Sequence, residues 1–302
     1  MSGTAIDFRK EMNFEYGVAE QVTPLVRRIV ARNPSGFTFH GTNSYIIGHG
    51  RVAVLDPGPL LDEHVGALAA ALKGETVERI IVTHTHNDHS PAAAPLRNLV
   101  GGEIQGAIPR PIAPGARTQE SIQYDFAPDV EIAHGDVIAG DGWSLEAVHT
   151  PSHMSNHMCF ALAEENILFT GDHIMGWNTT VVSPPDGNMT EYFASLEVCL
   201  ARGEETYWPA HGPMIPDPQP FTRGYRTRAF APFRRSLESS TATCRKKCTA
   251  PRHDRCWRIS NIWWIQAGFA ATARRTKPEP ISPAERNLRT GPIKCATAIY
   301  TA

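Results

Sequence analysis

The sequence lacks any apolar run near the ~20 residues that a membrane-spanning helix requires, and it has only six cysteines among 302 residues. Cysteine at this density does not support a disulfide scaffold. The first ten residues contain no apolar core of a secretory signal. Charged residues make up 20% and hydrophobic residues 41% of the chain, a balance that excludes wholesale disorder. These features predict a globular protein without membrane contact in a reducing, cytoplasmic setting.

Acidic residues are scarce in the last quarter of the chain. Residues 223–302 hold 17 Lys and Arg but 4 Asp and Glu, whereas the first 222 residues hold 12 and 27. The segment Pro213–Pro220 (PMIPDPQP) marks a boundary, and apolar periodicity is lost beyond it. We therefore predict a main domain at residues 1–222 and, at residues 223–302, a basic C-terminal helix followed by a poorly defined tail.

Strands alternate with helices in the main domain. Apolar or alternating runs predict strands, and apolar residues at helical spacing predict helices. The expected strands are Phe37–Gly48, Arg51–Asp56, Glu78–Thr83, Trp143–His149, His157–Leu162, Ile167–Thr170 and Glu205–Trp208. The expected helices are Leu61–Leu72, Pro91–Val100 and Met189–Ala201, the last with Thr190 as a candidate cap. This order predicts an α/β fold of two mixed sheets packed face to face with helices outside.

The strongest chemical signal is the run HTHNDH at residues 84–89, directly after an apolar strand. His84 and His86 point the same way if the chain stays extended, and a turn then brings Asp88 and His89 to a second point close by. Imidazole and carboxylate groups suit a borderline metal such as zinc. A polar loop that is merely rich in histidine is the alternative, but ligand-type spacing at a strand end favours a metal site.

Three further residues follow later strands. They are His153 after Trp143–His149, Asp172 after Ile167–Thr170 and His211 after Glu205–Trp208. Each alone is typical of a surface loop. Together with residues 84–89 they complete two metal sites.

This series resembles the metallo-β-lactamase superfamily, from Phe37 to about Pro216. The resemblance implies a four-layer αββα sandwich with two zinc ions per chain at one edge. It implies that His84, His86 and His153 hold the first metal, that Asp88, His89 and His211 hold the second, and that Asp172 bridges them. Asp56 matches the superfamily's strand-end Asp, a partner of the histidine loop.

The branch of the superfamily can be narrowed. The dedicated β-lactamases lack the bridging Asp that Asp172 supplies in Thr170-Gly171-Asp172. Phrases such as Pro209-Ala210-His211-Gly212-Pro213 resemble the lactamase-β-like hydrolase group, whose animal members are single-strand endoribonucleases. Ser152, in Thr150-Pro151-Ser152-His153, replaces the glycine that is usual in the Thr-Pro-Gly-His turn of this group. Residues 236–302 do not resemble the group's C-terminal domain.

These residues predict a binuclear metal-dependent hydrolase. The expected reaction is attack of a metal-bridging hydroxide on a small-molecule ester, thioester or lactone, with Asp88 orienting the hydroxide and moving its proton. The alternative is a phosphodiesterase acting on single-stranded RNA, and arginine is sparse around the motifs, which favours the first reading. A β-lactamase is less favoured, and a non-catalytic metal-binding module is disfavoured because both metal sites are complete. The sequence does not determine whether the protein forms an oligomer.

Other residues have less specific readings. We expect His149 and His157 at strand ends, and His173, Trp177, Asn178 and Tyr192 either in the pocket wall or in the core. In the tail, Cys244, Cys248, His253 and Cys256 have irregular spacing for a zinc knuckle, so unpaired thiols are the favoured reading. The tail's dense Arg, Cys, Trp and Ser favour a shifted reading frame over a native RNA-binding segment.

Overall fold

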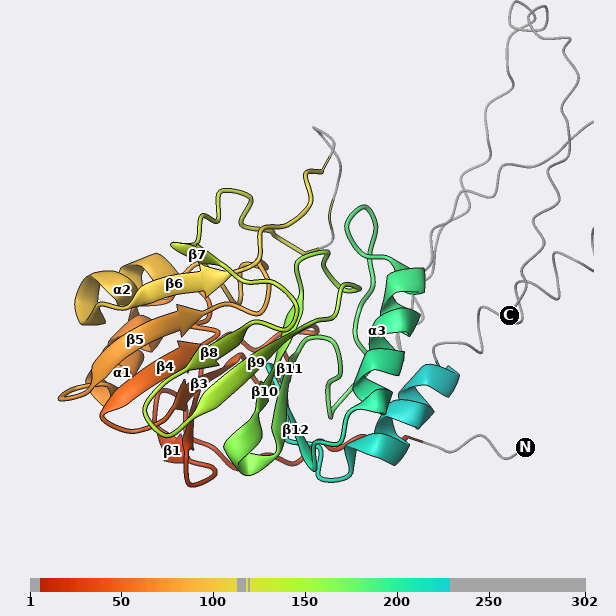
Figure 1. The fold of residues 1–302 in the computed structure, drawn as a ribbon, viewed down its shortest axis with the longest axis horizontal. Coiled ribbons are helices and arrows are strands. Elements are labelled where there is room, and N and C mark those ends of the chain that lie inside the picture. The colour runs from red at the N-terminus through yellow and green to blue at the C-terminus, as the bar shows by residue number, and fades with distance from the viewer. Residues whose placement is uncertain (1–5, 113–117, 119, 229–302) are drawn as a thin grey trace, which may run out of the picture. The chain divides into compact units, whose positions relative to one another are not determined.

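The structure is a computed structural model that describes residues 6–112, 118 and 120–228. Its strands form two sheets (Figure 1). The first sheet has the order β1-β2-β3-β4-β5-β6-β7 and the second the order β12-β11-β10-β9-β8. The strands of the first sheet are β1 (Glu20–Gln21), β2 (Val26–Val30), β3 (Asn43–Ile47), β4 (Arg51–Leu55), β5 (Thr76–Ile81), β6 (Glu103–Gly106) and β7 (Val130–Glu131). Those of the second are β8 (Val137–Ala139), β9 (Ser144–His149), β10 (Met158–Leu162), β11 (Ile167–Gly171) and β12 (Thr206–Pro209).

Helices cover the outer face of each sheet. Figure 1 shows α1 (Asp62–Ala71) and α2 (Ala93–Val100) on one side of the two sheets and α3 (Met189–Ala201) on the other. A short 3₁₀ turn, Ala163–Glu165, joins β10 to β11. The expected αββα sandwich is therefore confirmed.

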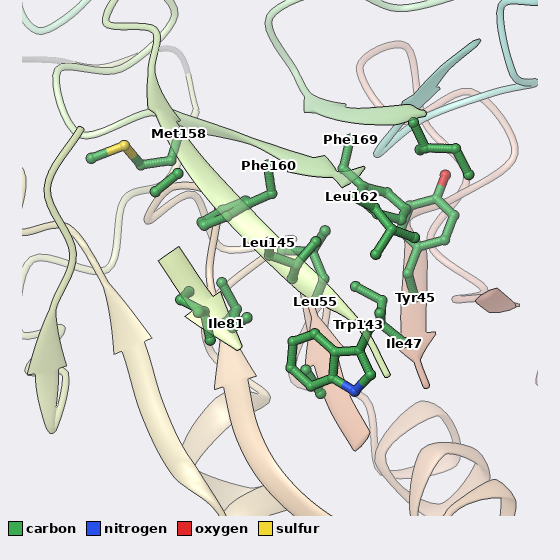
Figure 2. Close-up of a cluster of buried hydrophobic side chains, with 14 of the residues drawn as sticks. Tyr45, Ile47, Leu55, Ile81, Trp143, Leu145, Met158, Phe160, Leu162 and Phe169 are labelled. Atoms are coloured by element: carbon green, nitrogen blue, oxygen red, sulfur yellow. The ribbon is translucent and has the colours of Figure 1, made fainter. Parts of the chain in front are cut away.

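The core follows from strands that are apolar on both faces. In β4, Ala53 and Leu55 belong to the core between the sheets, whereas Val52 and Val54 pack with residues of α1 and α2. The same alternation in β10 directs Phe160 into the core between the sheets (Figure 2) and its neighbours toward α3. A period of two with both faces buried is what a central strand requires.

The C-terminal ends of several strands lie at one edge of each sheet. Strands β4, β5 and β6 are parallel, and so are β11 and β12. Strand β10 is antiparallel to both β9 and β11, so β9 runs with β11. The loops after β4, β5, β9, β11 and β12 carry the residues singled out by sequence, because such edges collect loop side chains into one site.

The chain continues past β12 as a helix at residues 218–228. Tyr225 in this helix is fully buried, and its hydroxyl donates to the Asn178 carbonyl at 2.5 Å. The helix thus packs on the same side as α3. The boundary at residue 222 stays a prediction, and the tail cluster Cys244–Cys256 lies outside the described residues. Among the described helices, none has both the length and the apolar character needed to cross a membrane.

Candidate metal centre

The loop after β5 is fixed in place by Asp56, which directly follows β4. The Asp56 carboxylate accepts hydrogen bonds from the Thr83 backbone N–H and hydroxyl, both at 2.8 Å, and lies 2.9 Å from His89 Nδ1. A turn closed by the His89 N–H on the His86 carbonyl, at 3.0 Å, then reverses the chain. This turn separates the side chains of His84 and His86 from those of Asp88 and His89, as the sequence predicts.

Three buried imidazoles meet at the first position. His153, from the loop after β9, has its Nε2 2.8 Å from His86 Nδ1, and His84 Nε2 lies 3.0 Å from the same atom. The three rings are at most 5% exposed. Nitrogens this close together can surround a single cation.

The second position is formed by Asp88, His89 and His211, the last from the loop after β12. Asp88 Oδ2 lies 3.2 Å from His211 Nε2 and 3.6 Å from His89 Nε2. These three also form a set that can hold a metal ion.

Asp172, after β11, lies between the two positions. Its Oδ2 is 3.6 Å from both His89 Nε2 and His153 Nε2, and its Oδ1 is 3.3 Å from His211 Nε2. It is the one described carboxylate that lies this close to residues of both sets. The structure thus brings together all seven residues that the sequence proposes as ligands.

The donor atoms fit a bound cation. His89 Nε2, His211 Nε2 and Asp172 Oδ1 are buried, and none has a partner with hydrogen-bonding geometry in the described structure. Three of the rings are anchored through their other nitrogen: His89 on Asp56, His153 on the Val181 carbonyl at 2.5 Å and His211 on the Gly41 carbonyl at 3.2 Å. In His89 and His211 the other ring nitrogen is left unpaired, which is the usual arrangement for histidines that bind metals.

Histidine pKa values are shifted in opposite directions at the two positions. Burial holds the pKa of His84 and His86 well below the usual range, so both rings are neutral and offer lone pairs. Burial also opposes the charge on His211, but Asp172 and Asp88 outweigh it and raise its pKa to about 10. Burial likewise opposes the charge on His89, but nearby carboxylates, Asp88 above all, raise its pKa well above the usual range. A cation bound at the second position would therefore displace protons from His89 and His211.

His157 holds the backbone of Asp172 through a hydrogen bond. Its Nε2 accepts the Asp172 backbone N–H at 3.0 Å, and its Nδ1 lies 2.9 Å from the Thr150 hydroxyl. Gly171, with φ of 49°, leaves room for this ring, because a Cβ there would lie 2.5 Å from His157 Nε2. The glycine of the Thr-Gly-Asp sequence is thus explained by the packing of His157 against the end of β11.

Comparison with known proteins identifies the family. The model of the Metallo-beta-lactamase superfamily matches residues 37–211, more than half of the chain. The chain belongs to this superfamily.

Curated relatives within the superfamily include two proteins described as atrochrysone carboxyl ACP thioesterases. The one from Aspergillus chevalieri is 34% identical over 205 residues, which cover 66% of this chain and 60% of the relative. The one from Cryptosporiopsis sp. is 30% identical over 223 residues, which cover 73% of this chain and 64% of the relative. The chain thus spans about 60% of the length of the curated relatives it matches.

Solved structures of superfamily members support the fold. A family member from Thermus thermophilus has a TM-score of 0.59 at 19% identity, covering 70% of this chain and 81% of its own. A beta-lactamase domain protein from Burkholderia ambifaria has a TM-score of 0.60 at 17% identity, covering 75% of this chain and 80% of its own.

The structure adds one acidic side chain that the superfamily motifs do not include. The Glu120 carboxylate lies 4.0 Å from both His86 Nδ1 and His153 Nε2, and its side chain is 13% exposed. Burial raises the pKa of this group. It lines a small pocket together with Met154 and Asp186. No signal in the sequence marks Glu120, because it does not follow a predicted strand.

The other histidines in the described part of the chain lie outside both sets. His149 Nε2 is 2.9 Å from the Ser155 carbonyl, and His173 is buried with its Nδ1 3.1 Å from the Ser152 hydroxyl. Tyr192 is also buried and contacts the His173 ring, which confirms the core reading for both residues. Trp177 is partly exposed.

Proposed function

We propose that this chain is a zinc-dependent thioesterase that hydrolyses an acyl thioester carried by an acyl carrier protein. The observation that supports hydrolysis best is the set of seven His and Asp side chains, gathered from the loops at strand ends, with unpaired donor atoms facing one another. The curated relatives support the thioester among the ester, thioester and lactone substrates that the sequence leaves open.

We assign two zinc ions to the site. His84, His86 and His153 would hold one, Asp88, His89 and His211 the other, and Asp172 would contact both. Zinc bound there would polarise the thioester carbonyl and lower the pKa of water. Neutral imidazoles at the first position suit this role, because a protonated ring has no lone pair to donate.

Asp88 is the residue best placed to handle the proton. Its side chain is 19% exposed, whereas the Asp172 and Asp56 side chains are 5% and 2% exposed. A carboxylate at the open side of the site can orient water, accept its proton and pass that proton to the leaving sulfur. The water oxygen bonds to the acyl carbon, the C–S bond breaks, and a carboxylic acid and a thiol are released.

A cytoplasmic setting is part of the proposal. Cysteine is sparse, and the described cysteines, Cys159 and Cys199, are free and buried. Free thiols are typical of a reducing compartment.

The test is a substrate panel with metal analysis. Elemental analysis of the purified protein should give about two zinc ions per chain. Thiol release from acyl thioesters of N-acetylcysteamine and of an acyl carrier protein should exceed turnover of a matched oxoester, a lactone and nitrocefin. Protein that binds no transition metal, or that releases no thiol when zinc is supplied, contradicts the proposal. Cleavage of labelled single-stranded RNA in place of the thioesters would establish the alternative reading.

A further inference from the structure

Aromatic side chains form a continuous row next to the loop that carries His211. Phe39 and Trp177 stack with ring centroids 4.8 Å apart and planes 14° apart. His40 lies 3.9 Å from Phe39, and Phe14 lies 5.4 Å from His40, measured between centroids. All four side chains are partly exposed. A row of large rings that is neither buried nor scattered provides an apolar face to solvent.

This row contacts the loop that carries His211. The Trp177 ring lies against Gly212, where an added Cβ would come within 2.7 Å of its Cδ1. Phe39 is also linked to His211 through the backbone: Gly41 follows Phe39 by two residues, and the Gly41 carbonyl anchors His211 Nδ1. Thr42 and His211 also form an isolated β-bridge. Phe39 and Trp177 therefore belong to or contact the segments that position His211, a candidate ligand of the second metal position.

The loop that presents Phe39 is fixed by its own hydrogen bonds. Phe39 has φ of 58°, a left-handed conformation that a bulky residue rarely adopts. The Phe39 N–H donates to the Ser35 carbonyl at 3.1 Å, and the Gly41 N–H donates to the Thr38 carbonyl at 2.9 Å. Asn33 Oδ1 accepts the Thr42 N–H at 2.9 Å. An unfavourable backbone conformation persists only where the surroundings hold it, and such positions concentrate at ligand sites.

We infer that Phe39 and Trp177 form a wall that receives a planar, ring-containing acyl group of the thioester substrate. This inference rests on the proposed thioesterase function and names the substrate class. Aromatic faces favour planar rings over saturated groups of similar size, because offset stacking adds attraction beyond the burial of apolar area. The wall thus selects the acyl group, while the zinc site acts on its carbonyl.

The kinetic test compares two thioesters of N-acetylcysteamine, one of 2-naphthoic acid and one of its saturated decahydro analogue. Trp177→Ala and Phe39→Ala should each raise KM for the naphthoyl thioester about 3- to 10-fold, with less change for the saturated analogue and kcat within about twofold. Trp177→Phe should restore most of the preference. Phe37→Ala is the matched control, because Phe37 is in the same loop, 38% exposed and outside the row.

Equal losses on both thioesters, or a fall in kcat alone, would show that the rings support His211 rather than the acyl group, and would overturn the inference. Metal content and thermal midpoint are measured for each variant to identify those that fail to fold.

A binding test separates this inference from the proposed function. The amide of 2-naphthoic acid with N-acetylethylenediamine has N–H in place of the thioester sulfur and no thiol to bind zinc. It resists hydrolysis, so its affinity for the zinc-loaded protein can be measured by calorimetry without turnover. It should bind wild type about 3- to 10-fold more tightly than Trp177→Ala. If wild type cleaves neither thioester, the thioesterase proposal fails, and this ratio alone decides whether the wall binds planar rings. A ratio of one rejects the wall.

Discussion

Asp172 is the side chain that lies close to both candidate metal positions. Its carboxylate lies within 3.6 Å of His89, His153 and His211. Asp172→Asn keeps the size of the side chain but removes the charge. Loss of an outer partner costs about 10- to 100-fold in metal affinity or activity, and loss of a direct ligand should cost more.

We therefore expect Asp172→Asn to hold fewer than two zinc ions and to lose at least about 100-fold in thiol release. Zinc content and turnover at limiting zinc measure both effects. Asp141→Asn is the control, since Asp141 is exposed and lies in a turn away from the candidate ligands. Full turnover in Asp172→Asn at limiting zinc would remove Asp172 from the ligand set.

His64 makes the stability of the folded chain depend on pH. His64 in α1 is 2% exposed, its Nε2 lies 2.8 Å from the Ser44 hydroxyl, and burial lowers its pKa to about 4. Well above its ordinary pKa of about 6.5, the ring is neutral in both the folded and the unfolded chain. As the pH falls toward 4, His64 becomes protonated in the unfolded chain but stays neutral in the folded chain. The free energy of unfolding therefore decreases.

His64→Gln should remove this part of the acid sensitivity. Between about pH 6.5 and pH 5, the free energy of unfolding of metal-free wild type should fall by about 1.5 kcal/mol more than that of the variant. Urea titrations at the two pH values measure the difference. His49→Gln, at an exposed turn, is the matched control. An identical pH dependence in wild type and His64→Gln would rule out His64 as the source.

At the scale of elements, the β11 end depends on Gly171. Its φ of 49° and the nearby His157 ring leave no space for a side chain. Gly171→Ala should therefore displace His157 and with it the backbone N–H of Asp172. We expect a loss of about 1–3 kcal/mol in the free energy of unfolding, together with weaker zinc binding.

Gly66 provides the contrast. It lies within α1, has no heavy atom within 4 Å of an added Cβ, and does not have a positive φ. Gly66→Ala should raise the free energy of unfolding by about 0.5–1 kcal/mol. Denaturant titrations of both variants test the pair, and similar behaviour of the two would mean that local packing at β11 is not the constraint.

Long apolar strands were predictable, whereas short or polar ones were not. The predicted strands and helices around β4, β5, β9 to β12 and α1 to α3 are confirmed within a few residues. Strand β2 (VRRIV) contains two arginines, and Arg28 is nevertheless buried and paired with Glu20 at 2.7 Å. Strands β6, β7 and β8 have two to four residues, too few to show a period.

Two local predictions were wrong for physical reasons. The expected strand Phe37–Gly48 begins only at Asn43, because hydrogen bonds within residues 33–42 override the alternating pattern. Asn188, not Thr190, caps α3, with its side chain accepting the N–H groups of Thr190 and Glu191. Asn188 and Thr190 both carry a side-chain oxygen that can cap a helix. The extended backbone at Asn188 makes it the N-cap residue.

The grouping of the seven candidate ligands was more predictable than the fold around them. Residues 84–89 carry their spacing within one loop, and the other three candidates each follow a strand. Glu120 and Phe39 could not be found in this way. The position of Glu120 near His86 and the contact of Phe39 with Trp177 depend on long loops whose path the sequence pattern does not determine.

For the whole molecule, the candidate ligands all lie at or before His211. The tail beyond residue 235 has a basic composition without apolar periodicity. We expect a chain ending at Ser239 to keep about two zinc ions and a cooperative thermal transition. Metal analysis and calorimetry of this truncation against the full chain test the expectation. A truncation that unfolds or loses zinc would make the tail structural and return attention to Cys244–Cys256.

The division of the site between the sheets has a thermodynamic consequence. One loop of the first sheet supplies His84, His86, Asp88 and His89, and three loops of the second supply the other candidates. A cation held by both groups acts as a cross-link between the two halves of the sandwich. By linkage, each tenfold rise in free zinc above the dissociation constant adds about 1.4 kcal/mol to the folded state for each zinc ion bound. The melting temperature should therefore rise with zinc activity and drop on chelation, so the stabilities of variants are comparable only at a fixed zinc activity.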